Sequence, residues 1–252
     1  MEHNFAVCKE NLSTYWGECK THKAVVRHDT GQIIGVVGKN YRLITHADVL
    51  NRVKKAIPDL ENERITTCRN GAVMFAKYST PILKSVEVQK GDIVSFGLEV
   101  FNSYDMSMPV GFQFVAKRLV CLNGMTIPKS IAYISVKHTN RANFGDIQDE
   151  FASRIPLISS TSDRWGEWTK TTPPEYKVET FLKTYAGKQL KDLFHERYTT
   201  SQDKSVWALF NILTHYSTHL LKVRKKQEEN RRLSQLAFDR RLTNHFYNYD
   251  WR

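Results

Sequence analysis

The stretch that decides the fold runs from Asp92 to Thr139 and contains two long apolar segments, DIVSFGLEVF at 92–101 and VGFQFVAKRLVCL at 110–122. Apolar and β-branched residues recur in both segments densely enough to predict two strands. Between them lies NSYDMSMP at 102–109, which favours a turn because Asn, Ser and Asp bond to nearby backbone and Pro cannot donate to a central ladder. The sequence therefore predicts a hairpin around which the chain is organised.

The second predicted strand has apolar residues on both faces. Phe112 and Phe114 share one face, and Val115 and Leu119 share the other, because alternate residues of a strand point to opposite sides. A strand that is apolar on both faces is typical of a sheet covered on both sides. We therefore expect this strand to be central.

The segment from Met106 to Gly145 contains no acidic residue. A stretch of one charge sign on a sheet attracts an anionic partner. The alternative is that these cations are solvated strand ends whose acidic partners lie elsewhere in the chain. Both interpretations stay open from the sequence. The cations in question are Lys117, Arg118, Lys129, Lys137 and Arg141.

The composition is that of a folded globular protein with a strong basic excess. Of 252 residues, 41% are apolar, and 37 basic side chains outnumber 26 acidic ones for a formal net charge of +11. An excess of this size favours nucleic acid or another polyanion as the partner. No run approaches the roughly 18 uncharged apolar residues of a membrane span, and the first residues lack signal-peptide character. We expect a cytoplasmic protein with no membrane partner, in the host cytoplasm if a phage encodes it.

The residues before the central hairpin predict a β-β-β-α unit. Two strands at 23–27 and 32–37 flank a turn, and a short strand follows at 41–44. Thr45 is expected to cap a helix that Pro58 ends. Further extended segments are expected at 64–68, 72–78 and 79–88.

Beyond residue 140 the pattern becomes helical. We expect a helix at 144–155 that ends before Pro156, followed by a Ser-, Thr-, Trp- and Pro-rich loop or hinge at 158–174. Gly187 is expected to separate two short helices. The strongest helix prediction is an apolar stripe at 206–223, capped by Thr200 or Ser201 and continuing into the charged segment 222–241.

Together these elements predict an α+β fold. Residues 1–145 form an antiparallel-rich sheet domain that contains the β-β-β-α unit. Residues 146–252 form a helical region that packs on the sheet and ends in a long basic helix and an aromatic tail at 246–252.

Catalytic motifs are absent from the sequence. His215 and His219 stand four apart on a predicted helix, but no Glu lies between them as in metalloproteases and no third ligand is evident. No phosphate-loop signature is present, so we expect neither nucleotide hydrolysis nor a cofactor. The four cysteines lie far apart and predict reduced thiols instead of a metal site. We expect no enzyme activity, although a metal-dependent nuclease stays open if Asp29, Asp105 and Asp146 converge.

Basic and aromatic residues are interleaved at several places along the chain. The pattern suits phosphate neutralisation combined with base stacking. For any single pair the alternative is an aromatic residue in the core beside a cation at its rim. The recurrence favours nucleic-acid binding. The candidates for phosphate contacts are Arg27, Lys39, Arg42, Lys117, Arg118, Lys137 and Arg141, and the candidates for base stacking are Tyr41 and Tyr133.

Several segments together resemble a known family. HDTGQIIGVVGKNYR at 28–42 is similar to the Val-x-x-x-Tyr region of the phage/plasmid-like proteins, a prokaryotic and viral family of unknown function. The other similar segments are FNSYD at 101–105, KRLVCLNGM at 117–125, KHT at 137–139 and WALFNILTHY at 207–216. Tyr104-Asp105-Met106 stands where the family pattern has His-Asp-Gly.

A weaker resemblance concerns the fold. The predicted β-β-β-α unit with its basic sheet is similar to the core of single-strand annealing recombinases, which assemble into rings or filaments that hold DNA in an outer groove. The resemblance implies a phage-type protein that binds single-stranded DNA and promotes annealing in recombination or replication, without ATP and as a homo-oligomer. The alternative from another class is a virion-associated or host-takeover interaction protein.

Overall fold

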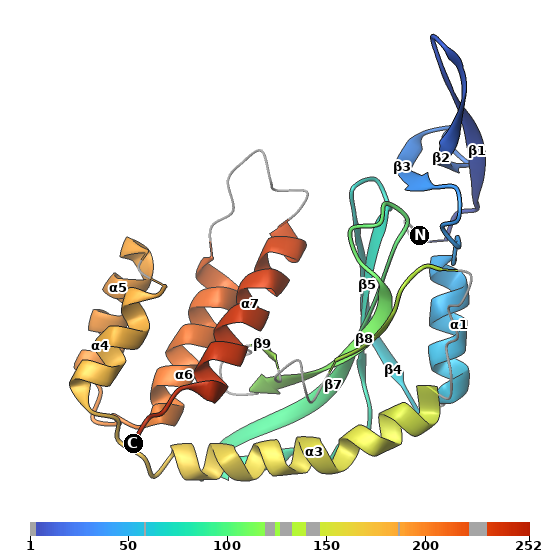
Figure 1. The fold of residues 1–252 in the computed structure, drawn as a ribbon. Coiled ribbons are helices and arrows are strands. Elements are labelled where there is room, and N and C mark those ends of the chain that lie inside the picture. Colours follow the sequence, from blue (N-terminus) through green and yellow to red (C-terminus); the bar gives the residue numbers. More distant parts are fainter. Residues whose placement is uncertain are drawn as a thin grey trace. The chain divides into compact units, whose positions relative to one another are not determined.

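The computed structural model describes residues 4–57, 59–118, 124–126, 133–139, 147–185, 187–221 and 231–252. The predicted α+β class is confirmed, because antiparallel strands fill the N-terminal half and helices the C-terminal half (Figure 1). The chain forms two compact units that are each discontinuous in sequence. Unit 1 contains Met1–Ile82, Gly97–Phe114 and Tyr133–Ser153, and unit 2 contains Leu83–Phe96, Val115–Ala132 and Arg154–Arg252. The boundary predicted between residues 145 and 146 lies outside the described residues.

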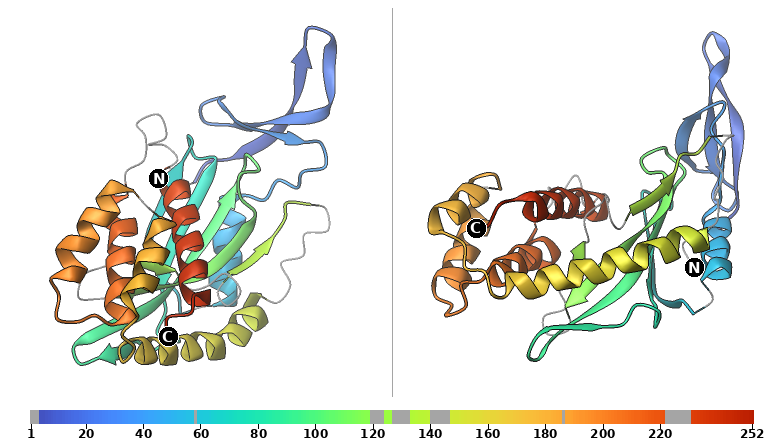
Figure 2. Two further views of the ribbon diagram at one scale, coloured as in Figure 1. Left: turned by 60° about the vertical axis from the view of Figure 1, so that its left-hand side comes forward. Right: turned by 60° about the horizontal axis from the view of Figure 1, so that its bottom comes forward.

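Unit 1 begins with a three-stranded antiparallel sheet in the order β1-β2-β3, formed by Val7–Thr14, Gly17–Arg27 and Ile33–Gly38. The predicted hairpin is confirmed, and it consists of the C-terminal part of β2 paired with β3. Gly31 in its turn has a φ of 67°. Both views of Figure 2 show the tip of the β1–β2 hairpin projecting from the rest of unit 1.

The β-β-β-α unit is present, but its third strand is not the predicted one. Residues 41–45 form neither helix nor strand, so the strand predicted at 41–44 is wrong. The third strand is β1, which pairs with β2 from Val7↔Arg27 to Thr14↔Gly17. Most of β1 is exposed and polar, so its sequence lacks the apolar alternation that marks a strand.

The predicted helix of this unit is confirmed as α1, His46–Ala56. The Thr45 side chain caps it by accepting a hydrogen bond from the Asp48 backbone N–H at 3.0 Å. Val49 and Val53 are buried on one helical face. Pro58, which was predicted to end the helix, lies outside the described residues.

The central hairpin is confirmed as β7, Asp92–Ser103, and β8, Val110–Arg118. Both strands contribute residues to each unit. Val110–Phe114 in β8 is buried on both faces, as predicted for a central strand. The path of the sheet is β10-β8-β7-β5-β4, with β6 paired to β7 and β9 to β8. The remaining strands are β4 Glu61–Cys68, β5 Val73–Ser79, β6 Val86–Gln89, β9 Gly124–Thr126 and β10 Tyr133–Val136.

The first C-terminal helix corrects the prediction around Pro156. Helix α3 runs through that proline from Ile147 to Trp168, so both the predicted end at 155 and the loop over 158–168 are wrong. A proline inside a helix costs about 3 kcal/mol. Burial of Ile158, Trp165 and Trp168 contributes roughly 2 kcal/mol for each side chain and outweighs that cost.

The other helices belong to unit 2. Gly187 precedes α5 and separates it from α4, as predicted. Ser205 caps α6 instead of Thr200 or Ser201, and Leu221 leaves the helical conformation, so the predicted continuation of this helix is wrong. Residues 222–230 lie outside the described chain. The elements are α4 Glu175–Lys183, α5 Lys188–Phe194, η1 His195–Thr199, α6 Val206–His215, η2 Tyr216–Leu220 and α7 Arg231–Asn248.

The aromatic tail packs back on unit 2. Phe246 and Trp251 are buried, and their rings contact Phe181 with centroids 5.4 Å and 5.1 Å away. Trp168 lies 5.0 Å from the Phe246 ring. Among the described helices, none is both long and apolar enough to cross a membrane.

At Gly35 the three-stranded sheet closely approaches the Tyr104–Asp105 loop. A Cβ atom added there would lie 2.6 Å from the carbonyl oxygen of Tyr104. We expect Gly35→Ala to lower the free energy of unfolding by about 1–3 kcal/mol, because backbone must move to admit the methyl group. Urea unfolding measures this. Gly38→Ala is the matched control, since a Cβ there meets nothing within 4 Å. Equal stability of the two variants would contradict the described contact.

Candidate functional site

Two segments that resemble the family lie side by side in unit 1, although they are 96 residues apart. The backbone N–H of Arg42 donates to the carbonyl oxygen of His138 at 3.1 Å. The Nδ1 of His138 donates in return to the carbonyl oxygen of Arg42 at 3.1 Å. The rings of Tyr41 and His138 are stacked, with centroids 4.6 Å apart and planes 13° from parallel. We call this arrangement the Tyr41–His138 joint.

A third family-like segment is bonded to this joint. The Tyr41 hydroxyl donates to the carbonyl oxygen of Ser103 at 2.8 Å. The Ser103 hydroxyl donates to the carbonyl oxygen of Met108 at 2.8 Å and accepts from its N–H at 3.1 Å. Tyr41 is only 8% exposed, and burial raises the pKa of its hydroxyl. The hydroxyl therefore stays neutral and serves as a structural donor.

A neighbouring buried network fixes the start of α1. The Nε2 of His46 lies 2.9 Å from the carbonyl oxygen of Gly71, and because a carbonyl only accepts, Nε2 carries the hydrogen. The Nδ1 of His46 then accepts from the Asn102 side chain at 2.9 Å, and Asn102 also donates to the carbonyl oxygen of Ile44 at 2.9 Å. The Tyr104 hydroxyl accepts from the His46 backbone N–H at 2.8 Å. The FNSYD segment thus positions both α1 and the Tyr41–His138 joint.

Four exposed cations surround this joint. The Lys9 ammonium, from β1, donates to the carbonyl oxygens of Tyr41 at 2.8 Å and of Lys39 at 3.4 Å. The two hydrogen bonds between Arg42 and His138 place Lys137 beside them. Within the described chain, no carboxylate forms an ion pair with Lys9, Lys39 or Lys137. Lys9, Lys39, Arg42 and Lys137 are all exposed, and we call them the basic cluster.

Asp105 is an acidic group that acts on the joint. Its charge contributes to the raised pKa of Tyr41. Its carboxylate is already bonded to the Arg69 guanidinium at 2.7 Å and to the Ser107 hydroxyl at 2.5 Å. Asp105 therefore serves the loop that carries it.

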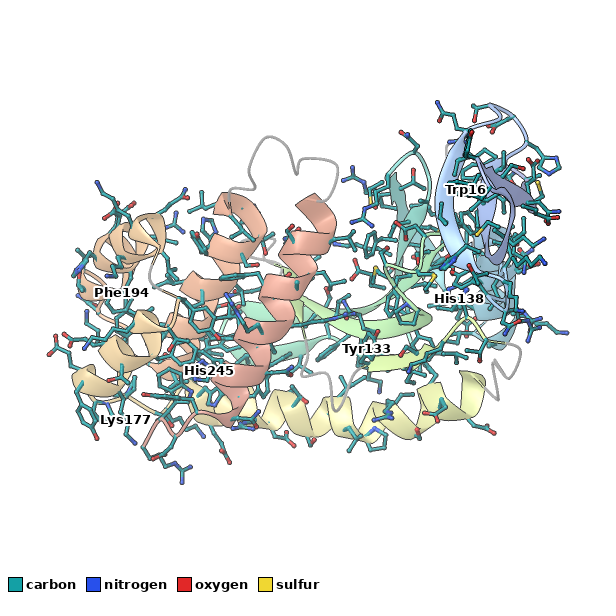
Figure 3. The ribbon with its side chains drawn as sticks, turned by 45° about the horizontal axis from the view of Figure 1, so that its top comes forward. Trp16, Tyr133, His138, Lys177, Phe194 and His245 are labelled. Carbon is teal, nitrogen blue, oxygen red and sulfur yellow. The ribbon has the colours of Figure 1, made fainter. Side chains whose placement is uncertain are left out.

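Only part of the predicted site is brought together. Lys39, Tyr41, Arg42 and Lys137 converge, but Tyr41 is buried in the joint and presents no free ring face. The Tyr133 ring, half-buried, is stacked on Phe101 with centroids 5.4 Å apart. Figure 3 labels Tyr133 and His138 among the side chains of unit 1. Arg141 lies outside the described residues.

Arg27 has a structural role. Its guanidinium bonds to Asp29 at 2.6 Å and to the carbonyl oxygen of Asn70 at 2.9 Å, and it lies 3.8 Å above the Phe5 ring. The side chain is 16% exposed. Arg27, a predicted phosphate contact, is therefore paired with a carboxylate in its own turn.

Arg118 and Lys117 belong to unit 2. Arg118 bonds to the buried Asp92 at 2.5 Å, and Asp92 also accepts from the Trp207 indole at 2.8 Å. Arg118 lines a polar pocket of about 220 Å³ with residues that include Arg197 and His215. Burial, followed by the charge of Arg197, lowers the pKa of His215. Lys117 is exposed.

The residues considered for metal binding do not converge in the described chain. Asp29 and Asp105 each bond to an arginine, and Asp146 lies outside the described residues. The His215 and His219 rings lie on one face with centroids 4.8 Å apart. The described residues contain no group of three or more His, Cys, Asp or Glu able to hold a metal ion.

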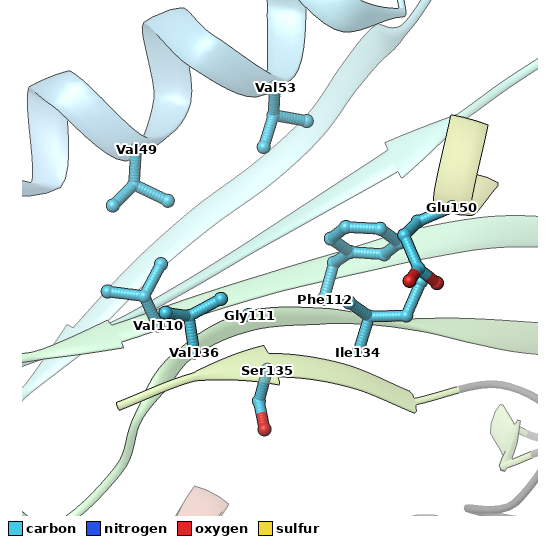
Figure 4. Close-up of a pocket in the computed structure, with 9 residues that line it drawn as sticks. All are labelled: Val49, Val53, Val110, Gly111, Phe112, Ile134, Ser135, Val136 and Glu150. Atoms are coloured by element: carbon cyan, nitrogen blue, oxygen red, sulfur yellow. The ribbon is translucent and has the colours of Figure 1, made fainter. Parts of the chain in front are cut away.

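A small apolar pocket lies near the site, between α1 and the sheet (Figure 4). Val49 and Val53 line one side, and β8 and β10 line the other, with Glu150 at its edge. Its volume of about 30 Å³ admits no more than a water or two. We interpret it as a packing gap.

Lys9 was not foreseen from the sequence. It lies on β1, the strand that the apolar pattern did not predict, and it precedes the segments that resemble the family.

The fold and the basic cluster define a basic α+β protein with buried family-like segments beneath exposed cations. The chain belongs to the family described as domain of unknown function DUF932, whose match covers residues 33–237. No curated protein and no solved structure matches the chain.

His138 makes the stability of unit 1 dependent on pH. Its Nε2 is buried without a hydrogen-bond partner, and burial lowers its pKa from 6.5 despite the bond to Arg42. The neutral form is therefore favoured in the folded state, and the unfolded chain binds the proton more readily. We expect stability to be full above pH 6.5 and to fall below it by up to about 1.4 kcal/mol per pH unit.

Urea unfolding between pH 5 and 8 measures this loss. His138→Phe keeps an aromatic ring against Tyr41 and removes the titrating group, so its pH dependence is expected to be shallower than that of the native chain. A residual slope is expected because burial also lowers the pKa values of His215 and His245. Identical slopes for the native chain and the variant would contradict the assignment.

Proposed function

We propose that the protein binds single-stranded DNA through the basic cluster and promotes annealing of complementary strands without nucleotide hydrolysis. The observation that carries the proposal is the convergence of four exposed cations, from β1, residues 39–42 and Lys137, on one structured joint. Cations on phosphate release condensed counterions, which supplies sequence-independent affinity. The net charge of +11 supports an anionic partner in the same way.

The joint gives the cluster a fixed backbone. Hydrogen bonds hold the segments that carry Lys39, Arg42 and Lys137, and Lys9 is tethered to two carbonyl oxygens of the same turn. A preorganised set of charges binds phosphate at a lower entropic cost than four side chains on independently moving segments. This favours a binding surface over a set of unrelated solvated cations.

Four cations give modest affinity, so we propose that several copies act together. A homo-oligomeric ring or filament would align the clusters along one strand and gain avidity without new contacts. The choice of single strands over duplex rests on the fold-level resemblance to annealing recombinases. The phage origin rests on the resemblance to phage/plasmid-like proteins.

The first test is the salt dependence of oligonucleotide binding. We compare the native chain with the triple variant Lys39→Gln, Arg42→Gln, Lys137→Gln by fluorescence anisotropy with labelled oligo-dT. The variant is expected to bind more weakly and to lower the slope of log affinity against log salt by about 2, because each phosphate that is no longer neutralised reduces the slope by about 0.7.

The matched control changes net charge by the same amount at exposed lysines of unit 2, Lys84→Gln, Lys90→Gln, Lys170→Gln. The control is expected to keep the native slope to within about 0.5, which is less than the effect of one phosphate. A strand-annealing assay with both variants, and the same titration with duplex DNA, tests the activity and the strand preference. Absent or salt-insensitive binding by the native chain would overturn the proposal.

A further inference from the structure

The tip of the β1–β2 hairpin exposes two aromatic rings. Tyr15 is 92% exposed and Trp16 is 91% exposed, whereas each of the other four tryptophans is at most 5% exposed. The two rings meet edge to face with centroids 5.0 Å apart. Figure 3 labels Trp16 on the β1–β2 hairpin. The other tryptophans of this protein are buried, so the exposure of Trp16 beside Tyr15 at the tip points to a partner.

The tip is built as a defined turn. The Thr14 hydroxyl accepts from the Trp16 backbone N–H at 3.2 Å and donates to the carbonyl oxygen of Gly17 at 2.9 Å. Gly17 has a φ of 108°, which favours glycine and closes the two-residue loop. The aromatic pair is therefore held on a fixed turn.

The hairpin is anchored at its other end. Residues 24–26 of β2 are buried, and the backbone of Gly35 in β3 packs against the Tyr104 carbonyl. Lys9, a member of the basic cluster, pairs with Val25 at this end of the hairpin. The six residue-to-residue steps from Lys9 to Tyr15 span roughly 20 Å of strand. The tip and the basic cluster thus lie along one β-ribbon.

Cations line the ribbon between these two ends. Lys20 and His22 are exposed, and Lys23 is half-buried and bonded to the Asn11 side chain. Glu10 and Glu18 are the acidic residues on β1 and β2. From Lys9 to the tip, the formal charges on the two strands are Lys9, Lys20 and Lys23 against Glu10 and Glu18, an excess of 3 − 2 = +1. Exposed rings beside a cationic strip fit an anionic chain that carries flat bases.

We infer that Tyr15 and Trp16 stack on bases of the same single strand whose phosphates contact the basic cluster. The inference rests on the proposed function and assigns its stacking groups. The predicted stacking residues cannot take this role as placed, because Tyr41 is packed on His138 and Tyr133 on Phe101. The hairpin tip lies outside the residues that match the family.

The experiment uses the single exposed tryptophan as a probe. Intrinsic fluorescence of the native chain is recorded during titration with oligo-dT and with an abasic oligonucleotide of equal length. Oligo-dT is expected to quench Trp16, and the abasic strand to bind without comparable quenching because it offers phosphates and no bases. Trp16→Phe is expected to abolish the signal, because the remaining four tryptophans are buried.

Affinity is measured in parallel by anisotropy. Tyr15→Ala, Trp16→Ala is expected to weaken oligo-dT binding between about 5-fold and about 150-fold, the range for removal of base–aromatic stacking, with an unchanged salt slope. Tyr176→Ala is the matched control, since Tyr176 is a 66% exposed aromatic residue on α4 in unit 2. The control is expected to bind like the native chain.

The outcomes separate the two proposals. Salt-dependent binding with no Trp16 quenching and no effect of the tip variant would overturn this inference and leave the proposed function standing. Absence of any binding to oligo-dT would overturn both. A Trp16 response to anionic phospholipid vesicles, with none to oligo-dT, would assign the tip to a membrane surface and also overturn the inference.

Discussion

The packing of the Tyr41 ring on His138, with the two hydrogen bonds between Arg42 and His138, is the interaction on which the arrangement of unit 1 depends. It joins a turn near the N-terminal sheet to a segment that follows β10. The Tyr41 hydroxyl extends the link to Ser103 at the end of β7. Without this joint, the cations at Lys39, Arg42 and Lys137 would lie on separate loops.

The same constraint explains why buried polar groups lie beneath a basic surface. Burying His138 with an unpartnered Nε2 favours its neutral form, which avoids a further positive charge under four exposed cations. The Asn102 amide nitrogen donates to one tautomer of His46 and helps to fix the start of α1. The FNSYD segment is thus a structural centre of unit 1.

Local signals in the sequence predicted local structure. The Thr45–Asp48 cap, the turn at Gly31 and the central β7–β8 hairpin depend on residues close in sequence, and they were predicted. Helix α3 was not, because the burial of Trp165 and Trp168 overrides Pro156. The site was predicted in part: the pairing of Arg118 with Asp92 and the approach of Lys9 to Tyr41 depend on contacts between distant segments.

The central claim is that three distant segments form one phosphate-binding surface. Hydrogen–deuterium exchange measured with and without oligo-dT tests it most directly. The account predicts simultaneous protection of peptides covering residues 4–16, 37–46 and 133–139, which weakens together as salt rises. Protection confined to the helices of unit 2, or no change in these three peptides while DNA is bound, would contradict it.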